Sequence, residues 1–520
     1  MTEPQDNLKS EPKENRMAQP QDSLKPDRQE NPSQLKLTTA RTLKWNTIDK
    51  VASQVLYAVT GIVLANVLPR ADFGLVGAIL VFQAFAILFV DSGFGAALLQ
   101  KKEPTDRDYS TVFWFNLAVS IAVYAVLYFC APHISDIFQH DRRLIPLSRV
   151  MFLSFIITGL GIVQTNRLMK RMDVKQIAIS NTVGLIVSGA AGIWMALSGW
   201  GAWALVWQTI ILTTMKTGWL WVVERWLPRA GFSLDSLRSI WRVGLGVFTT
   251  GFLNTLFLNI YSFVIGARYS LAALGDYTQA DKWSKMGSAS ISQIFTASFV
   301  PLLAKFQDDK EKYCALLSRI NQFAAFMTMP FMIFPAVMAL PIFHLLFGTK
   351  WDSAVILFQI LMVRGIFTVL SSTCNNYILA LGRARSLVRV EVVKDVTTAA
   401  AIAVTLPLRS VEALVWGQLV AGVLTWIFTV WLTSREAGYP IAGFLRDIWR
   451  YVALALLCGA AMWPAGILPL RPSVLLLIEG AIGLGLYIFI LKIFRNKILD
   501  EGAGYVFGRF RRKKSPISSE

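Results

Sequence analysis

The chain has 520 residues, of which 54% are hydrophobic and only 16% are charged, and its mean hydropathy is +0.49. A soluble protein of this size would carry about 25% charged residues, so a soluble globular fold is excluded. The formal net charge of +18 is compatible with nucleic-acid binding, but the basic residues are dispersed between apolar segments. Nucleic acid is therefore not an expected partner.

Residues 1–40 are polar, mixed in charge and almost free of aliphatic side chains. Such a segment cannot bury enough apolar surface to fold, so we predict a disordered cytoplasmic tail. No apolar core follows a basic start, which argues against a secretory signal.

From residue 42 onward, apolar runs of about 20 residues follow one another, each long enough to cross a bilayer as a helix. The sequence predicts an all-α polytopic membrane protein with about 14 spans. They lie near 42–68, 73–98, 109–131, 145–167, 175–197, 200–224, 240–267, 272–303, 313–345, 353–381, 386–407, 411–434, 448–468 and 472–494.

The basic residues are unequally divided between the two sides of the membrane. Loops that follow even-numbered spans contain 22 Lys and Arg, and the opposite loops contain 8. Lys and Arg are retained on the cytoplasmic side during insertion, so both termini are expected to be cytoplasmic.

Three pairs of segments recur along the chain at offsets of 209, 210 and 201 residues: Ala204–Trp207 with Ala413–Trp416, Asn166 with Asn376, and Ala71–Gly74 with Ala272–Gly275. One multi-helix unit is therefore used twice. Because each copy has six spans, both copies have the same orientation and the repeat is parallel.

The repeat divides the chain into four parts after the tail. We expect a first lobe at 41–225 (spans 1–6), a second lobe at 239–435 (spans 7–12), two further spans at 446–495, and a basic cytoplasmic tail at 496–520. Repeats of this kind place a shared cavity between two lobes.

Ionisable residues inside spans are costly in lipid and usually face a cavity. The second lobe contains Asp281, Lys282, Lys285 and Arg364 in spans 8 and 10, at roughly mid-membrane depth. The basic residues outnumber the acid, which favours an anionic ligand such as a phosphate or diphosphate. The alternative is that Asp281 merely pairs with Lys285.

Other polar side chains fall on single faces of their spans and are candidates for the same cavity: Tyr57, Asp91, Lys216, Asn254 and Asn375. Lys216 lies nearer the cytoplasmic end of its span, and its alternative role is to extend its amine to the interface.

No metal site and no catalytic motif is expected. The loop at 131–144 contains two His and two Asp, but their spacing fits no metal pattern, and the four cysteines suggest neither a metal nor a disulfide framework. No nucleotide-binding or hydrolase motif occurs. The chain is therefore not expected to be an enzyme.

The most specific sequence patterns lie in spans 1 and 2: Trp45-Asn46-Thr47, Val63-Leu64-Ala65, Asp72-Phe73-Gly74 and Asp91-Ser92-Gly93-Phe94-Gly95-Ala96-Ala97-Leu98-Leu99-Gln100. With the 6+6+2 arrangement of spans, they resemble the polysaccharide transporter family. This family belongs to the multidrug/oligosaccharidyl-lipid/polysaccharide exporter superfamily. The last segment is especially similar to flippases for O-antigen, colanic acid and other exopolysaccharide repeat units.

The resemblance implies two lobes in a V and transport by alternating access. It implies an oligosaccharide on undecaprenyl diphosphate as substrate, moved to the outer leaflet of the bacterial inner membrane for lipopolysaccharide or exopolysaccharide biosynthesis. The resemblance implies no cofactor. It implies coupling to a proton or sodium gradient. The implied protein partners are a polysaccharide polymerase and glycosyltransferases.

Two alternatives remain. A multidrug or small-molecule exporter of the same superfamily shares the fold, although a cationic cavity disfavours cationic drugs. A membrane glycosyltransferase or polymerase would need a substantial exterior catalytic loop, and the first exterior turn comprises only residues 69–72.

Overall fold

The computed structural model describes residues 32–91, 93–229 and 231–494, and all regular secondary structure in them is helical. The first part of the chain forms α1 (Pro32–Val67), α2 (Arg70–Asp91), α3 (Phe94–Gln100), α4 (Asp106–Ile137), α5 (Leu144–Met151), α6 (Leu153–Lys170), α7 (Val174–Leu197) and α8 (Ala202–Glu224).

The second part forms α9 (Leu234–Arg268), α10 (Leu271–Ala304), α11 (Lys310–Val337), α12 (Ala339–Leu346), α13 (Asp352–Ala380), α14 (Ala384–Thr405) and α15 (Val411–Ala437). The chain continues with α16 (Ile441–Met462) and α17 (Pro472–Ile493). Short 3-10 turns are η1 (Thr349–Trp351), η2 (Leu406–Leu408) and η3 (Trp463–Ile467).

Each of the fourteen predicted spans falls on one helix or on two consecutive helices. Among the described residues, twelve segments are long and apolar enough to cross a membrane. The other two predicted spans are α8 and α14, of 23 and 22 residues. The α14 sequence contains five charged residues, which lowers its hydropathy. A count of fourteen spans is consistent with this arrangement.

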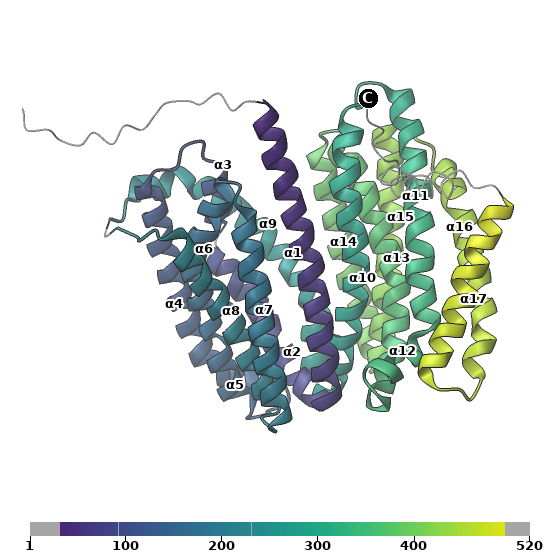
Figure 1. Ribbon diagram of the computed structural model, residues 1–520, viewed down its shortest axis with the longest axis horizontal. Coiled ribbons are helices and arrows are strands. Elements are labelled where there is room, and N and C mark those ends of the chain that lie inside the picture. The colour runs from purple at the N-terminus through teal and green to yellow at the C-terminus, as the bar shows by residue number, and fades with distance from the viewer. Residues whose placement is uncertain (1–31, 92, 230, 495–520) are drawn as a thin grey trace, which may run out of the picture.

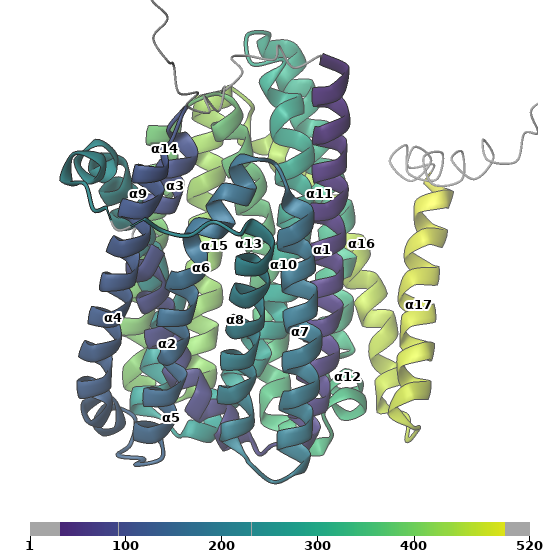
Figure 2. The ribbon, with the colours of Figure 1, turned by 60° about the vertical axis from the view of Figure 1, so that its left-hand side comes forward.

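The helices form two lobes, with α16 and α17 beyond the second lobe (Figure 1). In the first lobe α7 packs against α1 and α8, and α6 packs against α4 and α8; Figure 2 shows α1 beside α7. In the second lobe α13 packs against α10 and α15, and α14 packs against α15. This confirms the predicted fold class of two lobes followed by two C-terminal helices.

The lobes meet where α2 crosses α10. A Cβ placed on Gly74 would collide with the carbonyl oxygen of Leu271, and one placed on Gly275 would collide with that of Arg70. These two glycines are repeat equivalents, at an offset of 201 residues. The same position of each copy thus forms the crossing. The backbones can approach so closely there because glycine has no side chain.

Polar contacts fasten the lobes together at the predicted exterior end. Arg70 forms an ion pair with Asp276 at 3.0 Å. The amine of Lys350 donates to the carbonyl oxygens of Asn66 and Leu68 at 2.7 and 2.9 Å, and the Trp351 indole donates to that of Ala65 at 3.0 Å. We call these seven residues the exterior latch.

The position of α9 differs from the expectation that span 7 packs within the second lobe. It packs mainly against α2 and α3, and less against α10 and α4. The rings of Phe89 on α2 and Phe248 on α9 lie 4.9 Å apart. The preceding segment is anchored to α4, since Arg229 and Ser233 donate backbone N–H groups to Ser110 and Thr111. This short anchored linker explains why α9 remains beside the first lobe.

The expected tails are only partly described. Helix α1 begins at Pro32, inside the segment predicted to be a disordered tail, and residues 1–31 lie outside the described residues. The basic C-terminal tail also lies outside them, from residue 495 onward.

Candidate functional site

A helix break shapes the main polar cavity. The predicted span at 73–98 is not one helix: α2 ends at Asp91 and α3 begins at Phe94. Gly93 adopts a left-handed conformation with φ 68°, which glycine adopts without steric cost. Non-helical backbone at membrane depth is tolerated where it lines a cavity. The motif at 91–100 therefore places Asp91 and Gly95 in a cavity wall.

The first lobe encloses a cavity of about 660 Å³ between α1, α2, α3, α6, α7 and α8. Three predicted site residues line it: Tyr57, Asp91 and Lys216. Its other polar lining side chains are Ser53, Thr158, Thr165, Asn166, Asn181, Thr213 and Thr217. The amine of Lys216 thus belongs to a cavity wall.

Asp91 and Asn166 converge beside Gly95. A Cβ on Gly95 would lie 2.9 Å from the Asp91 Oδ1 atom and 2.7 Å from the Asn166 Nδ2 atom. The Asn166 amide donates to the carbonyl oxygen of Ile162 at 2.9 Å. Neither Asp91 nor Lys216 has an ion-pair partner in the described part of the chain, so both remain available to a ligand.

Sequence reasoning missed Asn166 and Asn181 as cavity residues. Asn166 served only as a marker of the repeat. Asn181 donates to the carboxylate of Asp49 at 3.1 Å, and Ser53 donates to the same group at 3.4 Å. The polar face of span 1, which contains Asp49 and Ser53, is the sequence signal that could have pointed to this wall.

In the second lobe one predicted charge pair is neutralised internally. The amine of Lys285 lies 2.6 Å from the Asp281 carboxylate, one helical turn away. The structure therefore agrees with the alternative interpretation, in which Asp281 pairs with Lys285. The Lys285 side chain remains 44% exposed, and the Asp281 side chain is 13% exposed.

Lys282 and Arg364 have no ion-pair partner among the residues that the structure describes. The Lys282 amine points toward α1, 2.7 Å from where a Cβ on Gly61 would lie. The Arg364 side chain packs against Gly422 of α15, and both it and Asp281 lie within electrostatic range of the buried Tyr277. Two uncompensated cations therefore remain in the second lobe.

The two asparagines predicted as site residues, Asn254 and Asn375, belong neither to the first-lobe cavity nor to the charged residues of the second lobe. Asn254 is exposed on α9 and does not line the first-lobe cavity. Asn375 on α13 has a buried Oδ1 atom with no hydrogen-bond partner in the described chain. The neighbouring Asn376 instead exchanges hydrogen bonds with Thr296 of α10, at 3.0 and 3.2 Å.

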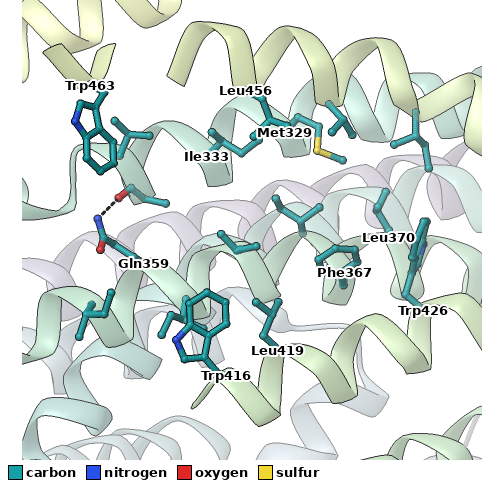
Figure 3. A pocket seen from close by; sticks show the side chains of 18 residues that line it. Met329, Ile333, Gln359, Phe367, Leu370, Trp416, Leu419, Trp426, Leu456 and Trp463 are labelled. Atoms are coloured by element: carbon teal, nitrogen blue, oxygen red, sulfur yellow. Dashed lines mark hydrogen bonds between the residues drawn. The ribbon is translucent and has the colours of Figure 1, made fainter. Parts of the chain in front are cut away.

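A second cavity, of about 560 Å³, is almost entirely apolar (Figure 3). Side chains of α11, α13, α15, α16 and η3 line it, including Met329, Phe367, Trp416, Trp426 and Trp463. Gln359 is its one amide, and it donates to the backbone oxygen of Ala336 at 3.0 Å. This groove suits a hydrocarbon chain and not a charged group.

Curated relatives are similar to this chain over most of its length. The succinoglycan biosynthesis transport protein ExoT of Rhizobium meliloti (strain 1021) is 24% identical over 79% of this chain and 82% of its own. The teichuronic acid biosynthesis protein TuaB of Bacillus subtilis (strain 168) is 23% identical over 88% and 97%. The lipopolysaccharide biosynthesis protein WzxC of Escherichia coli (strain K12) is 24% identical over 81% and 86%.

Solved structures share the fold. The lipid II flippase MurJ, in an inward closed conformation, matches with a TM-score of 0.72 at 13% identity, over 87% of this chain and 99% of its own. An inward-facing multidrug resistance MATE family transporter of the MOP superfamily matches with a TM-score of 0.54 at 16% identity, over 74% and 95%.

The family itself is identified by a profile described as "Polysaccharide biosynthesis protein", which matches residues 63–356. This range is more than half of the chain and includes the helix break, the lobe crossing and most of the lining of the first-lobe cavity. The chain belongs to the polysaccharide biosynthesis protein family, as the resemblance in spans 1 and 2 predicts.

Proposed function

We propose that this protein is a flippase that carries a lipid-linked oligosaccharide across the membrane by alternating access. The observation that carries the proposal is the pairing of two lobes, latched at one end, with unpartnered polar groups inside the membrane. The relatives named for succinoglycan transport and for teichuronic acid and lipopolysaccharide biosynthesis support this substrate class.

The anionic part of the substrate, a diphosphate, binds to Arg364 and Lys282. Arg suits this role because its planar fork donates two parallel hydrogen bonds, while Lys contributes a point charge. Lys285 contributes less, since Asp281 already neutralises it. A cationic drug would meet the same two charges unfavourably, which disfavours the multidrug exporter alternative.

The lipid chain of the substrate occupies the apolar groove between α13, α15 and α16. Its lining is almost wholly hydrocarbon and aromatic, and it lies between the second lobe and α16 with η3. A chain resting there would keep its hydrophobic surface out of water while the head group enters a polar cavity.

The expected setting is the bacterial inner membrane with both termini cytoplasmic. The transported units would come from glycosyltransferases and pass to a polymerase. A proton or sodium gradient would drive the cycle without a bound cofactor. To test orientation, a cysteine replacing Thr349 should react with an impermeant thiol reagent in whole cells, and one replacing Lys102 should not. The reverse labelling would refute the orientation.

The substrate role is tested by Arg364→Ala in cells that lack the native gene. A charge-assisted hydrogen bond contributes about 1.5–3 kcal/mol, so its loss should weaken binding roughly 10-fold or more. Surface polysaccharide should fall sharply while lipid-linked intermediates accumulate, and Arg364→Lys should recover part of the export. Arg471→Ala, in the predicted exterior loop before α17, is the matched control. Normal export by Arg364→Ala at normal protein level would contradict the proposed role.

A further inference from the structure

Repeat-equivalent positions differ where the first-lobe cavity opens. Gly95 corresponds to Thr296 at the offset of 201 residues, and Asn166 corresponds to Asn376 at 210. In the second lobe the Thr296 hydroxyl and the Asn376 amide bond to each other. In the first lobe Gly95 has no side chain to take that place.

The missing side chain leaves polar atoms without protein partners. The Asn166 carbonyl oxygen accepts no hydrogen bond from the described residues, and the Asp91 carboxylate has none either. Both groups lie beside Gly95 and line the cavity with the unpaired amine of Lys216. A cavity of this size with convergent unpaired polar groups has the character of a ligand site.

We infer that the first-lobe cavity is a glycosyl-binding subsite. It binds the sugar of the substrate, while the diphosphate binds in the second lobe. The inference rests on the proposed function and deepens it. Sugars present hydroxyls that both donate and accept hydrogen bonds. Carboxylate oxygens accept, the Lys amine donates, and Asn and Thr side chains do both. The Tyr57 ring, 44% exposed, offers an apolar face beside its hydroxyl.

The charges of this cavity favour a neutral polyhydroxylated group over an anion. Lys216 and Asp91 both line it, and Asp49 lies behind Asn181. A diphosphate would be opposed by the two carboxylates, which outnumber the single amine. The uncompensated cations Lys282 and Arg364 are in the other lobe, so the two parts of one substrate would contact different lobes.

The test uses the full-length protein in lipid nanodiscs and two probes. The first is the free repeat-unit oligosaccharide released by acid from the surface polysaccharide of the bacterium that carries this protein. The second is a sugar-free polyprenyl diphosphate. Calorimetry on the unmodified protein should detect both. Asp91→Asn, which preserves shape, and Gly95→Thr, which copies the second lobe, should each weaken oligosaccharide binding about 10-fold or more.

A matched control distinguishes a loss of binding in the cavity from general damage to the protein. Thr296→Ala changes the repeat-equivalent position outside the cavity and should leave oligosaccharide affinity unchanged. Absent oligosaccharide binding by the unmodified protein, or undiminished binding by Asp91→Asn and Gly95→Thr, would overturn the inference. The diphosphate probe reports on the proposed function separately, since its failure to bind would count against the anionic site alone.

Discussion

The two lobes derive from one repeated unit, yet they pack differently and present different polar side chains. Helix α1 lies along α7 of its own lobe, whereas its repeat counterpart α9 lies against α2 and α3 of the other lobe and barely contacts α14. The first lobe presents an open cavity with both charge signs. The second presents two cations, Lys282 and Arg364, that have no ion-pair partner among the described residues. The repeated unit therefore supplies the scaffold of both lobes, and the side chains that differ between the copies give two unlike surfaces.

The lobes remain alike at their ends. Gly74 and Gly275 form the crossing at the predicted exterior end. At the predicted cytoplasmic end Arg171 pairs with Glu224 in the first lobe and Arg383 pairs with Glu436 in the second, each partner shifted by 212 residues. The difference between Gly95 and Thr296 lies between these ends, within the predicted spans.

The lobe crossing should show the largest effect of substitution. Gly74→Ala and Gly275→Ala each place a methyl group against a backbone carbonyl of the other lobe. Backbone cannot rotate aside as a side chain can, so we expect a cost of about 3 kcal/mol and a marked fall in melting temperature. Both variants should behave alike, because the contacts are repeat equivalents.

Thermal unfolding of purified protein measures this effect. Gly218→Ala is the matched control, since a Cβ there meets no atom within 4 Å and replaces a helical glycine. It should stabilise α8 by up to about 1 kcal/mol. A large loss for only one of the crossing variants would show that the crossing is not symmetric.

Substitution in the exterior latch should have an intermediate effect, which is measured as the opening of that end of the protein. Arg70→Ala removes the ion pair to Asp276, a nearly buried carboxylate with 6% exposure. Loss of a hydrogen bond to a charged group costs about 1.5–3 kcal/mol. If that energy holds the exterior end closed, a cysteine replacing Tyr57 should react with an exterior thiol reagent about 10-fold faster.

The latch experiment uses a protein without its native cysteines. Lys312→Ala, which breaks an exposed pair with Asp309 at the start of α11, should not change the labelling rate. An unchanged rate in Arg70→Ala would mean that the glycine crossing alone closes this end.

Removal of the ion pairs at the predicted cytoplasmic end should have the smallest effect on stability. The Arg171 and Arg383 side chains are 59% and 50% exposed. The carboxylates that they leave are nearly buried, but Glu224 keeps its ion pair with Arg167 and Glu436 keeps its hydrogen bond from Ser386. Each arginine should therefore contribute about 0–1 kcal/mol, as exposed pairs do. Arg171→Ala and Arg383→Ala should lower stability in denaturant titrations by similar small amounts. A difference above about 1 kcal/mol between them would show that the lobes also diverge at this end.

Several features of the site could be predicted from residue types and spacing. The cost of polar side chains in lipid predicts a cavity role for Tyr57, Asp91 and Lys216, and all three line one cavity. The pairing of Asp281 with Lys285 follows from their spacing of one helical turn. Asn166 was overlooked because its role depends on the rotation of α6 relative to α3, which no local pattern encodes.

The sequence by itself determined the helical class, the approximate spans and the repeat. The reason is that a bilayer offers backbone groups no hydrogen-bond partner, so each apolar run of sufficient length must form a helix. Only the tertiary structure decided that α9 packs on the other lobe, and that Gly95 borders a cavity whereas its equivalent Thr296 bonds to Asn376. These outcomes depend on contacts between residues far apart in the chain, which close packing selects and local sequence does not specify.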